Sequence, residues 1–245
     1  MNVDNSISIG YDPQYHDRQF IEPYQSTISF CDWLVRLGAI SGKDAKICDV
    51  GCGKGANLYY MSKKFPDFFF TGIDIDEQLI REGNDFLKLS NVNNCQLKAG
   101  DLYKVGSYFG SKEFDGVISL QTLSWLDGYK GAIDAIASLS PKWIALTSLF
   151  FDGPIEAKTI INQYDDEHID NSFFYNTYSL PIVRQYLYDH GYKKFEFQRF
   201  EIPIDIPQNS EKKMGTYTEL TTDGRRLQIS GPLLMSWYFI YAVKS

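Results

Sequence analysis

Short apolar runs alternate with stretches of helical spacing along the first two thirds of the chain. Apolar residues recur every three or four positions from Tyr24 until Gly38, which predicts a helix there. Apolar runs predict buried strands at residues 45–48, 68–73, 95–98, 114–120 and 143–149. Helical patterns fall between them at residues 56–65, 77–89 and 130–138. Such alternation is typical of an α/β fold with a parallel sheet, right-handed crossovers and helices on both faces.

In the last third of the chain, strands and helices no longer alternate. A helix is predicted at residues 180–190, with Pro181 in its first turn and Gly191 as its stop. Strands are predicted at residues 195–206 and 233–243, and no helical pattern separates them. We therefore expect a Rossmann-like, doubly wound sheet of seven strands that is mostly parallel and ends in an antiparallel hairpin.

Two segments of the last third have no regular pattern. Residues 150–178 are irregular, aromatic and rich in acids and amides. Residues 208–232 form a connection that is long for a compact domain, and such connections are often lids or binding loops.

The chemistry begins directly after the first predicted strand, where residues 49–55 read D-V-G-C-G-K-G. Glycines at 51, 53 and 55 allow a sharp turn and let a ligand approach the main chain. The spacing is G-x-G-x-G, whereas dinucleotide-binding turns prefer G-x-G-x-x-G. Asp49 would repel a pyrophosphate but can hold a cationic amine, directly or through a water.

This loop resembles motif I of the class I S-adenosylmethionine-dependent methyltransferases. Two further acids at strand ends strengthen the resemblance, because Asp74 follows the second predicted strand and Asp101 the third. The resemblance covers residues 45–126 with specific motifs and only general architecture beyond them. It implies S-adenosylmethionine as cofactor and S-adenosylhomocysteine as product, and no metal is expected.

The resemblance also implies which residues hold the cofactor. Asp74 would accept hydrogen bonds from the ribose hydroxyls, and Asp101 would take the adenine amine, although a helix cap is the alternative role for Asp101. Cys52 is read as a small spacer in the loop. The full set of expected cofactor-binding residues is Asp49, Gly51, Cys52, Gly53, Asp74, Ile75, Asp101, Leu102 and Gln121.

In the resembled family the residues just past the strand 114–120 border both the cofactor and the acceptor. In this family an N-terminal segment often covers the active site, so residues 11–24 and the loop 208–232 are expected to close over the acceptor, with residues 150–178 as a second wall. Candidate acceptor-binding residues are Tyr24, Trp125, Tyr175 and Arg225. The sulfonium is already activated, so no nucleophile is required, and the candidate bases are His16, Glu22, Tyr175 and Tyr178.

Length and composition indicate the number of domains and disfavour some classes of partner. With 245 residues the chain is expected to form a single domain, made of a cover and helix (1–40), a cofactor-binding half (45–150) and an acceptor-pocket and hairpin half (151–245). The net charge of −7 disfavours a nucleic acid acceptor, and the motif Asn-Pro-Pro-Tyr is absent. Four cysteines without C-x-x-C spacing predict neither zinc site nor disulfide frame. No apolar stretch is long enough to cross a membrane, and no signal pattern is visible, so a cytoplasmic protein is expected.

The sequence thus predicts methyl transfer to an oxygen or nitrogen of a small metabolite. A non-catalytic cofactor-binding partner module with the same fold is the alternative. An NAD-dependent oxidoreductase is disfavoured by the glycine spacing, by Asp49 and by the terminal hairpin. Neither the identity of the acceptor nor the oligomeric state can be predicted.

Overall fold

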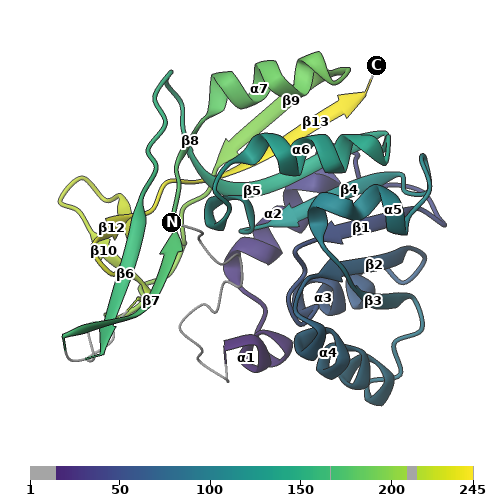
Figure 1. The fold of residues 1–245 in the computed structure, drawn as a ribbon, viewed down its shortest axis with the longest axis horizontal. Helices are drawn as coiled ribbons and strands as arrows, with labels where there is room; N and C mark the ends of the chain where they lie inside the picture. The colour runs from purple at the N-terminus through teal and green to yellow at the C-terminus, as the bar shows by residue number, and fades with distance from the viewer. Residues whose placement is uncertain (1–14, 166, 209–213, 245) are drawn as a thin grey trace.

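A seven-stranded path runs through the centre of the molecule (Figure 1). The computed structural model describes residues 15–165, 167–208 and 214–244. The strands follow the order β3-β2-β1-β4-β5-β13-β9, and β8 (Tyr178–Ser179) pairs with the end of β5. The path is made of β3 (Cys95–Ala99), β2 (Phe69–Asp74), β1 (Lys46–Val50), β4 (Gly116–Leu120), β5 (Trp143–Phe151), β13 (Trp237–Lys244) and β9 (Tyr192–Arg199). Only β13 runs antiparallel to its neighbours, which confirms the predicted α/β class and the antiparallel terminal pair.

Helices cover both faces of this sheet, and each face has its own hydrophobic core. One face packs against α2 (Gln25–Arg36), α3 (Ala56–Lys64) and α4 (Glu77–Leu89) through residues such as Phe30, Leu58 and Ile80. The other packs against α5 (Val105–Tyr108), α6 (Tyr129–Ser138) and α7 (Leu180–Asp189) through residues such as Ile133 and Leu187. Burial on both faces explains why β4 is buried at every position and reads as a continuous apolar run.

The N-terminal segment forms a separate short helix, α1 (Tyr15–Ile21), which lies beside α3 and α4 (Figure 1). Residues 11–14 of the predicted cover lie outside the described residues. Two short 3₁₀ turns, η1 (Leu102–Lys104) and η2 (Leu123–Trp125), follow β3 and β4 at the edge where the parallel strands end.

The segment 150–178 is more regular than its sequence suggests. It contains the antiparallel ribbon of β6 (Ile160–Asp165) and β7 (His168–Phe174), which projects from the main sheet (Figure 1). The expectation of an irregular stretch was therefore wrong. Polar residues on both faces of the ribbon hide the alternation, because most of its side chains stay partly or fully exposed.

The loop 208–232 also contains strands. β10 (Thr216–Leu220), β11 (Arg226–Ser230) and β12 (Leu233–Leu234) form a small three-stranded sheet. As a result β13 begins at Trp237 rather than at residue 233, and β9 ends at Arg199, before Pro203, rather than at residue 206.

Candidate active site

Four consecutive parallel strands bring the predicted cofactor residues to one edge of the sheet. β1, β2, β3 and β4 run in the same direction, and Asp49, Asp74, Asp101 and Gln121 stand at or directly after their carboxyl ends. In open α/β sheets this edge is where ligands bind. The fold therefore gathers residues that are far apart in the sequence.

The glycine loop has backbone conformations that favour glycine. Gly51, Gly53 and Gly55 have φ values of 80°, 55° and 81°, in the left-handed region. A Cβ on Gly51 would lie 2.5 Å from Thr122 Oγ1, and one on Gly55 would lie 2.7 Å from Leu97 Cδ1. The loop is thus a tight turn packed against β3 and the segment after β4, as the sequence predicts.

Asp49 is the most unusual side chain at this edge. It is 1% exposed, and neither carboxyl oxygen has a hydrogen-bond partner within the described part of the chain. Burial, together with the nearby Asp74 carboxylate, raises the pKa of Asp49 to about 8. A buried carboxyl group without a partner is costly, so the position suits a ligand that brings a cationic donor.

Asp74 differs from the expectation that it bonds chiefly to ligand. Its Oδ2 accepts a hydrogen bond from Gly53 N at 2.7 Å, and its Oδ1 accepts one from Asp76 N at 3.0 Å. Asp74 therefore ties the glycine loop to the end of β2. Each oxygen keeps one more lone pair for a hydroxyl donor. The neighbouring Ile75 is 68% exposed and open to a flat apolar group.

Asp101 caps a short turn, which was the alternative role considered for it. Its Oδ1 accepts a hydrogen bond from Tyr103 N at 2.9 Å, and its Oδ2 lies 3.7 Å from Lys104 Nζ. The side chain stays 28% exposed, so capping and ligand contact are compatible. Leu102 is the first residue of this turn and is half-buried.

Gln121 links the end of β4 to the N-terminal helices. It is one of the non-glycine residues with positive φ, at 62°, and its Nε2 donates to Ser26 Oγ on α2 at 3.3 Å.

Cys52 lies between Gly51 and Gly53 in the glycine loop and is buried. Burial raises the pKa of its thiol well above the ordinary value. Cys52 therefore fills space in the loop and stays protonated.

Three aromatic side chains meet beyond η2. The Trp125 ring centroid lies 5.0 Å from that of Phe173 and 4.7 Å from that of Tyr175. Phe173 and Tyr175 are buried, while Trp125 is partly exposed. The structure thus joins Trp125 and Tyr175, two predicted acceptor residues, and adds Phe173 from β7, which was not among them.

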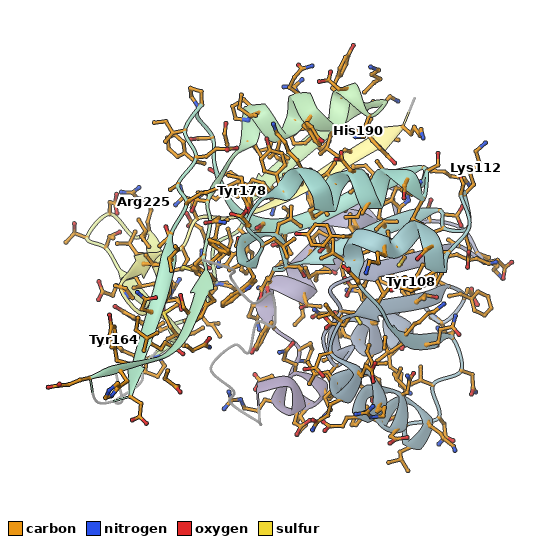
Figure 2. The ribbon with its side chains drawn as sticks, in the orientation of Figure 1. Tyr108, Lys112, Tyr164, Tyr178, His190 and Arg225 are labelled. Atoms are coloured by element: carbon orange, nitrogen blue, oxygen red, sulfur yellow. The ribbon has the colours of Figure 1, made fainter. Side chains whose placement is uncertain are left out.

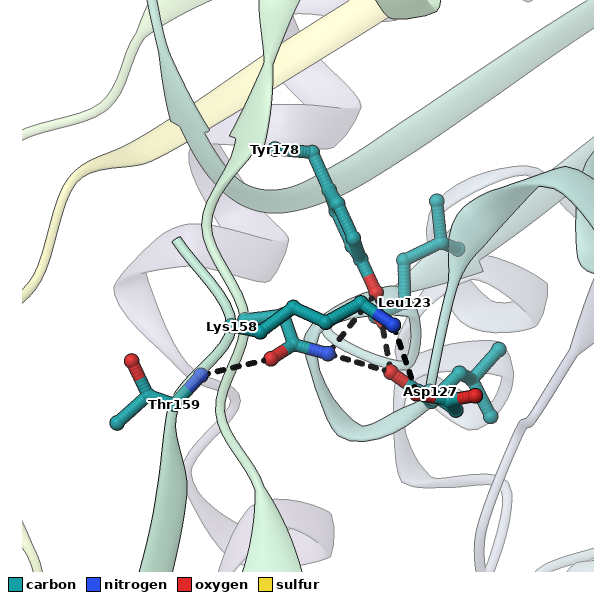
Figure 3. Close-up of polar contacts among 7 residues, drawn as sticks. Leu123, Asp127, Lys158, Thr159 and Tyr178 are labelled. Atoms are coloured by element: carbon teal, nitrogen blue, oxygen red, sulfur yellow. Dashed lines mark hydrogen bonds and ion pairs between the residues drawn. The ribbon is translucent and has the colours of Figure 1, made fainter. Parts of the chain in front are cut away.

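Asn176 holds the chain next to this aromatic cluster and was missed by the sequence reasoning. It bonds to Thr159 and Tyr178, which are labelled in Figure 3. It is fully buried; its Oδ1 accepts from Thr159 N at 3.0 Å and its Nδ2 donates to Leu126 O at 2.8 Å. Its backbone N donates to Ser124 O at 2.8 Å. A lone asparagine in a polar stretch carries no sequence signal for such a role.

Tyr178 has a structural role in the same network. Its hydroxyl lies 3.0 Å from the carbonyl oxygens of both Leu123 and Leu126. Burial is the main cause that raises the pKa of Tyr178 to about 12. A phenol so engaged is a poor base, and this speaks against the catalytic role considered for Tyr178.

The remaining predicted residues lie apart from this cluster. Arg225 is in the β10–β11 turn, where its Nε lies 2.9 Å from Asp223 Oδ2, and Figure 2 shows it at the outer side of the small sheet. Tyr24 precedes α2 without a side-chain capping hydrogen bond, and Glu22 is exposed just before it. His16 belongs to α1, but its side chain lies outside the described residues. The structure does not bring Arg225 to the strand edge.

Other features of the described residues limit the chemistry. No group of three or more histidine, cysteine or acidic side chains among them could hold a metal ion. No helix in the same residues is long and apolar enough to span a membrane. A pocket lined by Lys112, Lys142 and Lys244 lies at the opposite edge, where β4 and β5 begin, and is not part of this site.

Comparisons with known proteins agree with this geometry. Residues 47–140 match the model of a methyltransferase domain family. The chain is 30% identical over 105 residues to malonyl-[acyl-carrier protein] O-methyltransferase 2 of Ilyobacter polytropus, which covers 42% of this chain and 39% of that protein. It is 29% identical over 160 residues to a tRNA (guanine-N(7)-)-methyltransferase of Streptococcus thermophilus, which covers 60% of this chain and 64% of that one. The chain thus aligns with less than two thirds of the length of either relative.

A solved structure shows the same fold over most of the chain. Magnesium protoporphyrin IX methyltransferase from Synechocystis PCC 6803, crystallised with bound SAM, has a TM-score of 0.54 at 19% identity and covers 90% of this chain and 79% of that one. The domain match lies over β1 to α6, the part that carries the glycine loop and the strand-end acids. Residues 47–140 therefore match a methyltransferase domain, and the chain shares the fold of a methyltransferase that was crystallised with SAM.

Proposed function

We propose that this protein transfers the methyl group of S-adenosylmethionine to an oxygen or nitrogen of a small-molecule metabolite. The observation that carries the proposal is the buried, unpartnered carboxyl group of Asp49 beneath the glycine loop. The cofactor's amino acid end carries a cationic amine, the group that such a carboxylate binds best. A pyrophosphate offers no cationic donor to this group.

The edge of the sheet offers a partner for each part of the cofactor. Asp49 would bind the amine, and the main chain of the glycine loop would lie against the amino acid end. Asp74 would accept from the ribose hydroxyls with its remaining lone pairs, while Ile75 and Leu102 would border the adenine and Asp101 would take its amine. When bound, the cofactor supplies a methyl group already activated on a sulfonium.

The chain's own residues then orient the acceptor and exclude water. Trp125, Phe173 and Tyr175 form an aromatic wall beside the end of β4, and the Gln121–Ser26 hydrogen bond draws α2 toward the same place. Alignment of acceptor and donor is the main contribution to such a displacement. If the acceptor carries a proton, Glu22 and His16 of the N-terminal cover and Tyr175 are the remaining candidates to remove it.

A small acceptor is favoured by the aromatic wall and by the acidic surface, with a net charge of −7. A tRNA guanine is the second candidate acceptor, because a relative of that activity aligns with 60% of this chain. Phosphate contacts of a tRNA would require a basic surface, and the charge balance argues against one.

Purified protein would test the proposal in two steps. S-adenosylhomocysteine should raise the melting temperature, whereas NAD and ATP should not. At a hundredfold excess over Kd, binding adds about 2.7 kcal/mol to the free energy of unfolding. Turnover would then be assayed against a metabolite panel and against bulk tRNA. Methylation of tRNA alone would replace the acceptor assignment. Tight S-adenosylhomocysteine binding with no turnover on either would favour the non-catalytic partner module.

A further inference from the structure

Lys54 lies between two glycines of the cofactor loop, yet its side chain is only 11% exposed. Its Nζ lies 2.6 Å from Asp17 Oδ1 on α1 and 2.8 Å from Glu82 Oε2 on α4. Burial lowers the pKa of Lys54, but the hydrogen bonds to Asp17 and Glu82 outweigh it and raise the pKa above its ordinary value. Lys54 therefore stays charged and joins three separate elements.

The backbone of Lys54 is held as firmly as its side chain. A Cβ on Gly83 of α4 would lie 2.3 Å from Lys54 O, so α4 packs directly against this peptide. On the preceding residue, Gly53 N donates to Asp74 Oδ2 at 2.7 Å. The conformation of the glycine loop thus fixes the backbone of Lys54, and the two carboxylates hold its ammonium.

Helix α1 depends on tertiary contacts to stay folded. It has seven residues, too few for a helix that is stable without tertiary contacts. Phe20 is buried, with ring centroids 3.9 Å from Phe86 and 5.6 Å from Tyr59. The contact of Phe20 anchors the end of α1, and the Lys54–Asp17 ion pair links its first turn to the glycine loop.

We propose that Lys54 is a positioning residue that couples the docking of α1 to the cofactor-binding conformation of the glycine loop. The docked helix holds the loop through Lys54, and an ordered loop holds the helix through the same ammonium. By linkage, any ligand that orders the loop must strengthen the docking of α1, and loss of the link must weaken that ligand. The identity of the ligand rests on the proposed function; the link between α1 and the loop does not.

The test compares Lys54→Met, Asp17→Asn and the double variant with a matched control. Lys64→Met removes an ion pair of the same kind, Lys64 Nζ to Asp32 Oδ1 at 2.5 Å, which joins α3 to α2 and does not touch α1. Hydrogen exchange of residues 15–21 is measured on the ligand-free proteins. Calorimetry then gives the affinity for S-adenosylhomocysteine.

Lys54→Met and Asp17→Asn should each speed exchange in α1 and weaken S-adenosylhomocysteine binding by about 3- to 10-fold. Lys54→Met should have the larger effect, because it removes the ion pairs to both Asp17 and Glu82. The double variant should be no worse than Lys54→Met, and Lys64→Met should behave as wild type. Added salt should shrink the difference between wild type and Asp17→Asn, since Asp17 is exposed.

Unchanged exchange of residues 15–21 in both single variants would overturn the coupling, whether or not the protein binds the cofactor. Additive losses of affinity in the double variant would also overturn it. Wild-type protein that fails to bind S-adenosylhomocysteine would instead contradict the proposed function, while the exchange measurement would still decide the link. Asp17→Asn lies at the surface, so it remains informative if Lys54→Met does not fold.

Discussion

The two halves of the binding edge are built in different ways. On the cofactor side, the groups come from strand ends and from the main chain of one glycine loop, and their positions follow from the parallel sheet. On the proposed acceptor side, they come from side chains on and directly after β7, such as Phe173 and Tyr175, and the hydrogen bonds of Asn176 hold this segment. Variants on the two sides should separate cofactor affinity from turnover.

The largest effect is expected for Gly51→Ala, on the cofactor side. The new Cβ would have to fit at a positive φ and 2.5 Å from Thr122 Oγ1, so we expect a loss of about 2–4 kcal/mol in the free energy of unfolding and no measurable S-adenosylhomocysteine binding. Gly42→Ala is the control, because its φ is 87° but no atom lies within 4 Å of the added Cβ. Urea denaturation should show the control losing only about 1 kcal/mol. Equal losses would mean that the Thr122 contact relaxes freely.

On the acceptor side, Asn176→Ala should come next. It leaves the buried Thr159 N and Leu126 O without their partners, which costs about 2–3 kcal/mol in the free energy of unfolding. Because Leu126, next to Trp125, then loses its hydrogen bond, the Trp125 ring should be held less firmly and turnover should fall. The affinity for S-adenosylhomocysteine should stay within about threefold of wild type. Calorimetry and a methyl transfer assay give the two numbers. A parallel fall in affinity would show that the two sides are not separable.

The sequence predicted the strand-end residues better than the residues of the later segments. Asp49, Asp74 and Asp101 could be placed from sequence, because strand ends and glycine spacing fix them locally. The β6–β7 ribbon could not, because its polar faces carry no clear alternation. Asn176 was missed because its role depends on hydrogen bonds to Thr159 and Leu126, which lie 17 and 50 positions away in the sequence. Arg225 was selected as a residue of the loop 208–232, which was expected to close over the acceptor, and the structure pairs it with Asp223 instead.

Asp74→Ala should weaken S-adenosylhomocysteine more than Asp101→Ala does. Asp74 bonds to the loop as well as facing the ligand, so its loss removes ribose contacts and frees Gly53 N, about 2–4 kcal/mol of binding free energy. Asp101→Ala removes one amine contact and one cap, about 1 kcal/mol. Calorimetry ranks the two. The opposite order would place the ribose away from β2.

A smaller, pH-dependent effect should arise from Asp49. Its folded pKa is raised to about 8 from 3.8, so the ligand-free folded state binds the proton that the unfolded state releases, and the free energy of unfolding should fall as pH rises from about 4 to 8. Because a cationic amine prefers the ionised carboxylate, affinity for S-adenosylhomocysteine should rise over the upper part of that range. Calorimetry at pH 7 in two buffers of different ionisation enthalpy should detect proton release. Binding without proton release would show that Asp49 is already ionised.

The most direct test of the central claim is the affinity of Asp49→Asn for S-adenosylhomocysteine, with its melting temperature at pH 8 recorded beside it. Asparagine keeps the volume and cannot carry the charge. We predict that affinity falls at least about 100-fold, or roughly 2.7 kcal/mol, while the ligand-free protein melts at the same temperature as wild type or higher, because a buried carboxyl without a partner has been removed. Affinity within about threefold of wild type would contradict the account, since Asp49 would then not be the group that recognises the cofactor.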